Sequence, residues 1–123
     1  MTEREAWELN TKIAEVLGFR FEEFADKLRI ITPRPSEQWK QEAFGAVLVP
    51  RDSKYPYETP FDIGLRDWAR DTDAALELVT GNHWTVTLWQ DKGFWYADIP
   101  AHGDRKGGTP AEAICRAWLM TEV

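Results

Sequence analysis

The sequence predicts a mixed α/β fold of the α+β type, an α-β-α sandwich in which helices cover both faces of an antiparallel sheet. Two observations predict it. Three segments carry the start signals of helices, and residues 83–99 read as a β-hairpin with large apolar side chains on both faces. A sheet with one face in water alternates apolar and polar residues, so apolar side chains on both faces indicate that both are covered.

The three predicted helices begin with recognisable N-terminal signals. Residues 2–17 start with a capping box and continue as an apolar stripe with helical spacing. Residues 71–79 start with Asp71 or Thr72 as the N-cap, and Gly81 follows as a stop signal. The last helix starts at Thr109, a threonine N-cap, with Pro110 at the first helical position.

The predicted hairpin has residues 91–93 as its turn and lies at the centre of the sheet. With three residues in this loop, Trp89 lies opposite Trp95. Residues 28–32 and 44–49 predict two further short strands in the less regular middle of the chain.

The composition restricts the class of protein. The chain has 123 residues and no linker or repeat, so we expect residues 1–123 to form a single domain. Its 15 Lys and Arg against 21 Asp and Glu give a net charge of -6, which argues against binding duplex DNA through its phosphates. No apolar run is long enough to cross a bilayer, so no membrane partner is expected. A lone cysteine, Cys115, cannot form an internal disulfide, which favours a cytoplasmic location.

Several segments resemble the phage ABA sandwich domain family. They are the helix at residues 71–79 (DTDAALELV), the tryptophan-led strands of residues 84–95, and the AICRA run at residues 113–117. The resemblance covers residues 9–19 and 70–120. It implies a small α-β-α sandwich of a kind that bacteriophages and prophages encode, located in the host cytoplasm, and it implies no set of catalytic residues.

Seven tryptophans in so short a chain are the most unusual feature of the composition. A small domain gains much from burying aromatic rings, since each removes roughly 150–250 Å² from water, and this explains most of them as core residues. The alternative is a stacking platform for a planar ligand in the irregular middle of the chain, where loops carry ligand contacts. The candidates for that platform are Trp39, Tyr55, Tyr57 and Trp68.

The segment before the last helix combines glycines with basic residues. Unpaired amides, the helix dipole and positive side chains together favour a phosphate or carboxylate, although the spacing is not that of a Walker A loop. The alternative is a solvated connection whose charges keep it in water. The candidate anion-binding residues are Arg105, Lys106, Gly107, Gly108 and Thr109.

Metal binding and catalysis have little support in the sequence. His83 and His102 are not at a metal-ligand spacing, and Cys115 lies among residues spaced as a helix core, where a thiol is normally inert. Asp67 and Asp71 are interleaved with arginines, which suggests a solvated ion-pair surface. We therefore expect no enzyme, no cofactor and no metal.

Two functions remain open on the sequence alone. The first is a phage-encoded, non-catalytic binding protein that sequesters a small nucleotide-like anion, with aromatic rings on its base and Arg105 and Lys106 on its phosphate, to counter host defence. The second is a protein–protein interaction module, for a host protein or as a homo-oligomeric accessory protein. Arginine and aromatic residues enrich both kinds of surface, so composition does not decide, and we favour the first.

Overall fold

The computed structural model describes residues 1–24, 27–31, 46–50, 65–100 and 102–120. Along the chain the elements are α1 (Glu3–Val16), β1 (Arg20–Phe24), β2 (Lys27–Ile31), β3 (Ala46–Pro50), α2 (Thr72–Gly81), β4 (Thr87–Asp91), β5 (Phe94–Ile99), β6 (Gly103–Gly107) and α3 (Pro110–Met120). The chain divides into two compact units. One comprises Met1–Ile13 with Arg66–Val123, and the other Ala14–Leu65.

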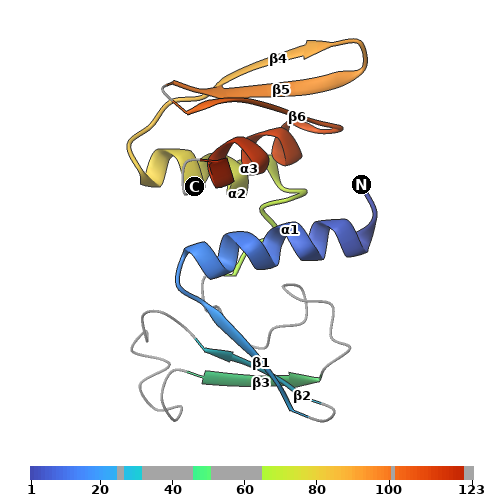
Figure 1. Ribbon diagram of the computed structural model, residues 1–123, viewed down its shortest axis with the longest axis vertical. Coiled ribbons are helices and arrows are strands. Elements are labelled where there is room, and N and C mark those ends of the chain that lie inside the picture. Colours follow the sequence, from blue (N-terminus) through green and yellow to red (C-terminus); the bar gives the residue numbers. More distant parts are fainter. Residues whose placement is uncertain (25–26, 32–45, 51–64, 101, 121–123) are drawn as a thin grey trace. The chain divides into compact units, whose positions relative to one another are not determined.

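The described residues form three helices and two small antiparallel sheets, so the mixed α+β class predicted from the sequence is confirmed (Figure 1). One sheet has the strand order β1-β2-β3 and the other the order β4-β5-β6. This combination of helices and sheets is compatible with a sandwich of layers.

All three predicted helix starts are confirmed by their capping hydrogen bonds. The backbone N–H of Glu5 donates to the hydroxyl of Thr2 at 3.1 Å, as a capping box requires. The carboxylate of Asp71 accepts two N–H groups from the first turn of α2. The hydroxyl of Thr109 accepts the N–H of Glu112 at 3.2 Å at the start of α3. Local sequence therefore fixes where these helices begin.

The turn of the predicted hairpin has two residues rather than three. Lys92 and Gly93 both have positive φ, at 51° and 83°, which is the backbone signature of a type I′ turn. Trp89 consequently pairs with Tyr96, and the predicted pairing of Trp89 with Trp95 is wrong. The two-residue turn is favoured because its twist matches that of the strands, and it moves every side chain of one strand by one register position.

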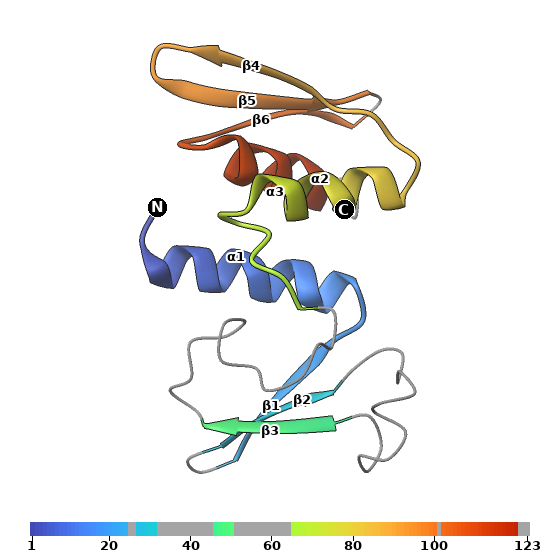
Figure 2. The same ribbon diagram turned by 180° about the vertical axis from the view of Figure 1, so that it is seen from behind.

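One face of the β4-β5-β6 sheet lies against helix α3, and α2 packs beside α3 (Figures 1 and 2). Ala97 and Ile99 of β5 are fully buried on this face, and so is Ile114 of α3. Gly107 of β6 marks the closest approach: a Cβ atom there would lie 2.7 Å from the backbone nitrogen of Ala113. The core of this unit thus lies between one sheet face and two helices.

The second unit contains the β1-β2-β3 sheet. The two strands predicted in the middle of the chain are present as β2 and β3, displaced by one or two residues from their predicted bounds, and β1 was not predicted. In β2, Leu28 and Ile30 are buried and alternate with more exposed residues, so the strand has one core face.

Candidate binding surface

The face of the β4-β5-β6 sheet that points away from α3 carries a group of exposed aromatic side chains. Residues paired across antiparallel strands point to the same face, so Trp89 and Tyr96 share a face, and so do Tyr96 and Lys106. We call this surface the open face. By register it comprises Thr87, Trp89, Asp91, Phe94, Tyr96, Asp98, Asp104 and Lys106.

Among the described residues of this unit, the helices lie on the other face of the sheet only (Figures 1 and 2). The second helical layer expected over the hairpin is therefore not among them. The exposure of the side chains agrees with this arrangement. Trp89 is 38% exposed and Phe94 is 44% exposed, whereas Ala97 and Ile99 on the covered face are fully buried.

The aromatic side chains of the open face are held by one another and by one lysine. The rings of Trp89 and Tyr96 stack with their centroids 5.5 Å apart and their planes 7° from parallel. The ammonium group of Lys106 lies 4.8 Å from the centre of the Phe94 ring, which is a cation–π distance. These contacts hold the rings of Trp89, Tyr96 and Phe94 in place as an apolar shelf on the sheet.

Carboxylates lie at both ends of this shelf. Asp91, Asp98 and Asp104 lie on the open face by register, against a single cation, Lys106. That cation is already placed over Phe94. By register, the described residues of the open face therefore carry more negative than positive charge, which disfavours phosphates and favours cationic groups.

The predicted anion site is not assembled as the sequence suggested. Arg105 and Lys106 belong to strand β6 rather than to a loop, and successive strand residues point to opposite faces. Lys106 lies over Phe94 on the open face, whereas the guanidinium of Arg105 donates to the carbonyl oxygen of Asp104 at 2.6 Å. The two basic side chains therefore do not converge on one ligand.

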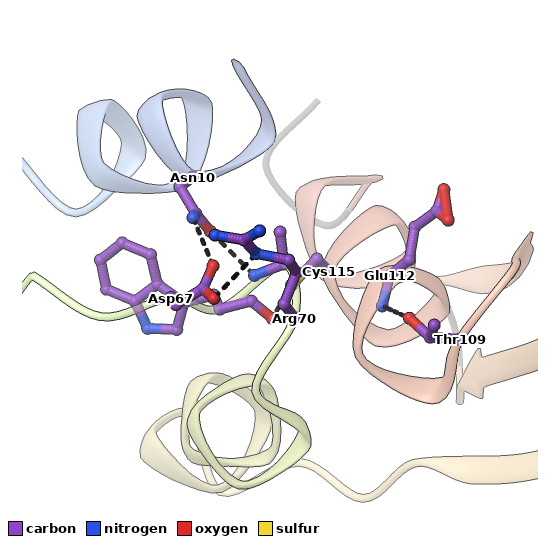
Figure 3. A network of polar contacts seen from close by, with 8 residues as sticks. Asn10, Asp67, Arg70, Thr109, Glu112 and Cys115 are labelled. Atoms are coloured by element: carbon purple, nitrogen blue, oxygen red, sulfur yellow. Dashed lines mark hydrogen bonds and ion pairs between the residues drawn. The ribbon is translucent and has the colours of Figure 1, made fainter. Parts of the chain in front are cut away.

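The amides at the start of α3 are also engaged within the protein. The N–H of Gly108 donates to Oε1 of Glu112 at 3.0 Å, and Oε2 of the same carboxylate accepts from Nε of Arg116 at 3.0 Å. Thr109 serves as the N-cap through its contact with Glu112 (Figure 3). Gly107 is buried against α3. An internal carboxylate thus occupies the place where an external phosphate was expected.

The predicted aromatic platform differs from the one that the structure describes. The ring of Trp68 is not available for stacking, because this residue is only 3% exposed. Trp39, Tyr55 and Tyr57 lie outside the described residues. The exposed rings instead come from the hairpin, in Trp89 and its neighbours. Sequence reasoning assigned Trp89 to the core, and recognising the two-residue Lys-Gly turn would have paired it correctly with Tyr96.

A separate network of polar contacts joins α1 to the segment before α2 (Figure 3). Asn10 is 1% exposed, and its amide donates to Oδ1 of Asp67 at 2.8 Å while its carbonyl oxygen accepts the N–H of Ala69 at 2.8 Å. Arg70 pairs with the other carboxylate oxygen of Asp67 at 3.1 Å. Because these groups satisfy one another, the network accounts for a buried asparagine as a structural anchor.

The thiol of Cys115 belongs to the same core. It donates to the carbonyl oxygen of Trp68 at 3.1 Å and is fully buried. Burial raises the pKa of Cys115 far above its usual range, and the negative charge of Asp67 raises that pKa further. The thiol therefore stays protonated near neutral pH, which is the opposite of what a nucleophile needs.

Two further features, a metal-binding group and a membrane-spanning helix, are absent from the described residues. No three His, Cys, Asp or Glu side chains there are grouped to hold a metal ion. None of the helices in the described part of the chain combines the length and the apolar character needed to cross a membrane.

Comparison with known proteins adds no relative: no protein-family model, no curated protein and no solved structure matches the chain. The resemblance to the phage ABA sandwich family therefore stays a prediction from the residues quoted for it.

Proposed function

We propose that this protein is a non-catalytic binding protein that uses its open face to hold a partner protein with exposed lysines or arginines. Of the two functions left open by the sequence, this is the protein–protein interaction module. The observation that carries the proposal is the shelf formed by the exposed rings of Trp89 and Phe94 and the half-buried ring of Tyr96, with carboxylates at both ends of it.

Exposed aromatic rings on one rigid surface are typical of an interface. Tryptophan and tyrosine are enriched at the residues that contribute most to binding, since they bury a large area and lose little conformational freedom. The stacking of Trp89 on Tyr96 already fixes both rings in the free protein. A partner would therefore meet a surface that requires little further ordering.

The charges of the open face select the chemistry of the partner. One guanidinium or ammonium group of the partner can stack on the indole of Trp89, and another can pair with Asp98 or Asp104. The net charge of -6 on the whole chain attracts the same kind of partner from a distance. A basic, partly apolar protein surface satisfies both the aromatic rings and the carboxylates.

The nucleotide-binding function has weaker support. Arg105 and Lys106 point to opposite faces, and the amide of Gly108 is engaged by Glu112. The phage origin and the role against host defence rest on the resemblance to the phage ABA sandwich family alone. They are therefore kept as parts of the proposal. In that setting the partner is a host protein.

Short synthetic peptides arrayed with graded net charge and aromatic content test the proposal with defined probes. We expect the wild-type chain to retain basic peptides in preference to acidic peptides of the same length. Phe94→Ala removes a 44%-exposed ring of the open face and should weaken the retention of basic peptides, and Asp104→Lys should reduce the preference for basic over acidic peptides. Trp7→Ala is the matched control, since Trp7 is 40% exposed on α1.

Two outcomes would overturn the proposed function. One is retention of basic peptides that Phe94→Ala and Asp104→Lys leave unchanged. The other is tight binding of ATP or a cyclic dinucleotide that depends on Arg105 and Lys106, which would restore the nucleotide-binding alternative.

A further inference from the structure

We propose that the outer edge of β4 pairs with the same edge of a second copy of this chain, which joins two three-stranded sheets into one continuous antiparallel sheet. The inference goes beyond the proposed function, because it rests on the outward backbone groups of the β4 edge, although Trp89 of the open face would also meet its counterpart there. Its partner is another copy of the protein.

Strand β4 is an edge strand in the part of the chain that the structure describes. The strand order β4-β5-β6 gives it one neighbour. Apart from Leu88, which is half-buried, its residues are exposed. An unpaired strand edge presents backbone N–H and C=O groups that can template pairing with another strand.

The two-residue turn determines which backbone groups face outward. In such a hairpin the residues that flank the turn, Asp91 and Phe94, form a hydrogen-bonded pair, and bonded and non-bonded pairs then alternate along the strands. Trp89 therefore bonds inward to β5 with its backbone. Leu88 and Gln90 stand at non-bonded positions and direct their N–H and C=O groups outward.

This outward pattern is complementary to itself. Consider a second copy that runs antiparallel and is related to the first by a two-fold axis at Trp89. Leu88 of each copy then lies opposite Gln90 of the other copy. Each of these pairs exchanges both of its outward N–H and C=O groups. Such an interface uses the same surface on both copies, so it closes as a dimer and does not propagate into a fibre.

The side chains agree with this register. Trp89 of the two copies would meet at a non-bonded pair, where Cα atoms approach to about 4.5 Å and side chains contact most closely. The stack of Trp89 on Tyr96 would then continue across the axis. Asp91 would oppose Thr87 of the second copy, so no like charges face each other across the new pair.

The opposite edge of the sheet lacks this complementarity. Strand β6 carries Asp104, Arg105 and Lys106 in succession, and charged side chains of this kind protect an edge from pairing. In β4 the only charged residue is Asp91 at the end of the strand. The two edges thus differ in the property that decides whether a strand can be added.

Sedimentation equilibrium of the full-length protein, without any peptide or partner, tests the proposal. We expect a monomer–dimer equilibrium for the wild type. Gln90→Pro removes one outward N–H and no hydrogen bond within the sheet, and should weaken the dimer roughly 10- to 100-fold. Gln90→Ala keeps the N–H and is the matched control, with wild-type association.

A second pair of variants keeps the test decisive if Gln90→Pro fails to fold. Thr87→Asp places a carboxylate opposite Asp91 of the second copy and should weaken the dimer, whereas Thr87→Lys places a cation there and should preserve or tighten it. A wild type that is monomeric at all concentrations overturns the inference. So does a dimer that responds to neither Gln90→Pro nor Thr87→Asp. Phe94 lies on the central strand, so Phe94→Ala tests the open face without altering the β4 edge. The dimer inference and the proposed function can therefore be refuted separately.

Discussion

The two faces of the β4-β5-β6 sheet differ in the size of the side chains they carry, and the larger rings lie on the exposed face. On the covered face the fully buried positions are Ala97 and Ile99, beside the buried Gly107. On the open face, the same strands carry Trp89 and Phe94, which are 38% and 44% exposed. Large aromatic residues would usually be expected in the core of so small a unit, so the difference needs a physical reason.

The reason lies in how closely helix α3 approaches the sheet. Around Gly107 the helix backbone comes so near that a single Cβ atom would meet it at 2.7 Å. Small residues allow this close packing, and larger ones such as Trp95 lie half-buried beside it. The covered face therefore gains stability from contact density, whereas the rings of the open face remain available to a partner.

The largest effect on stability is expected on the covered face. Ile99→Ala removes a fully buried side chain between β5 and α3, and should lower the free energy of unfolding by about 2–5 kcal/mol, through lost burial and the cavity left behind. Urea unfolding monitored by tryptophan fluorescence measures it. Ile99→Val keeps most of the volume and should cost only about 0.5–1.5 kcal/mol. Equal losses for the two variants would mean that cavity volume does not govern this face.

The next largest loss of stability is expected where helix α3 approaches the sheet closely at Gly107. Gly107→Ala forces a methyl group against the backbone nitrogen of Ala113, and should lower the free energy of unfolding by about 1–3 kcal/mol. Gly108→Ala is the neighbouring control, because its Cβ would meet Glu112 Oε1 at 3.6 Å, an ordinary contact. That variant should range from no change to a stabilisation of about 1 kcal/mol. If both substitutions are equally harmless, α3 does not pack on the sheet as closely as described.

Helix starts and the mixed α+β class were predictable because each depends on a few neighbouring residues. The capping groups of Thr2, Asp71 and Thr109 act within their own first turn, and all three are present. The same local reasoning placed β2 and β3 within one or two residues. Local chemistry was sufficient for these elements because no distant contact was needed to define them.

The candidate site was predictable only in part, because it depends on register and on packing at a distance. Counting one residue too many in the turn paired Trp89 with Trp95 and assigned the rings of both to a covered sheet. Reading Arg105 and Lys106 as a loop hid the fact that strand alternation separates them. The burial of Trp68 depends on a core assembled from distant segments, which spacing within the sequence does not reveal.

The turn that sets this register is exposed, yet substitutions of its glycine should lower the stability of the protein. Gly93 has a φ of 83°, so Gly93→Ala forces a Cβ into the left-handed region and should cost about 1–2 kcal/mol, although nothing lies within 4 Å of the new atom. Gly93→Asn should recover much of that loss, since asparagine adopts this conformation more readily. Thermal unfolding of the wild type, Gly93→Ala and Gly93→Asn measures the order of their melting temperatures. A wild-type melting temperature for Gly93→Ala would contradict the type I′ turn and with it the pairing of Trp89 with Tyr96.

The smallest effect on stability is expected where the proposed binding role is largest. Phe94→Ala removes a ring that is 44% exposed and a cation–π contact with Lys106, and should lower the free energy of unfolding by about 1 kcal/mol or less. Urea unfolding, as used for Ile99→Ala, measures this loss of stability. The two residues lie on opposite faces of the same strand, so their losses can be compared directly. A loss as large as that of Ile99→Ala would mean that Phe94 is covered in solution and that the two faces do not differ as described. A small loss of stability, together with lost retention of basic peptides, would separate the residues that hold the sheet on α3 from those that remain available to a partner.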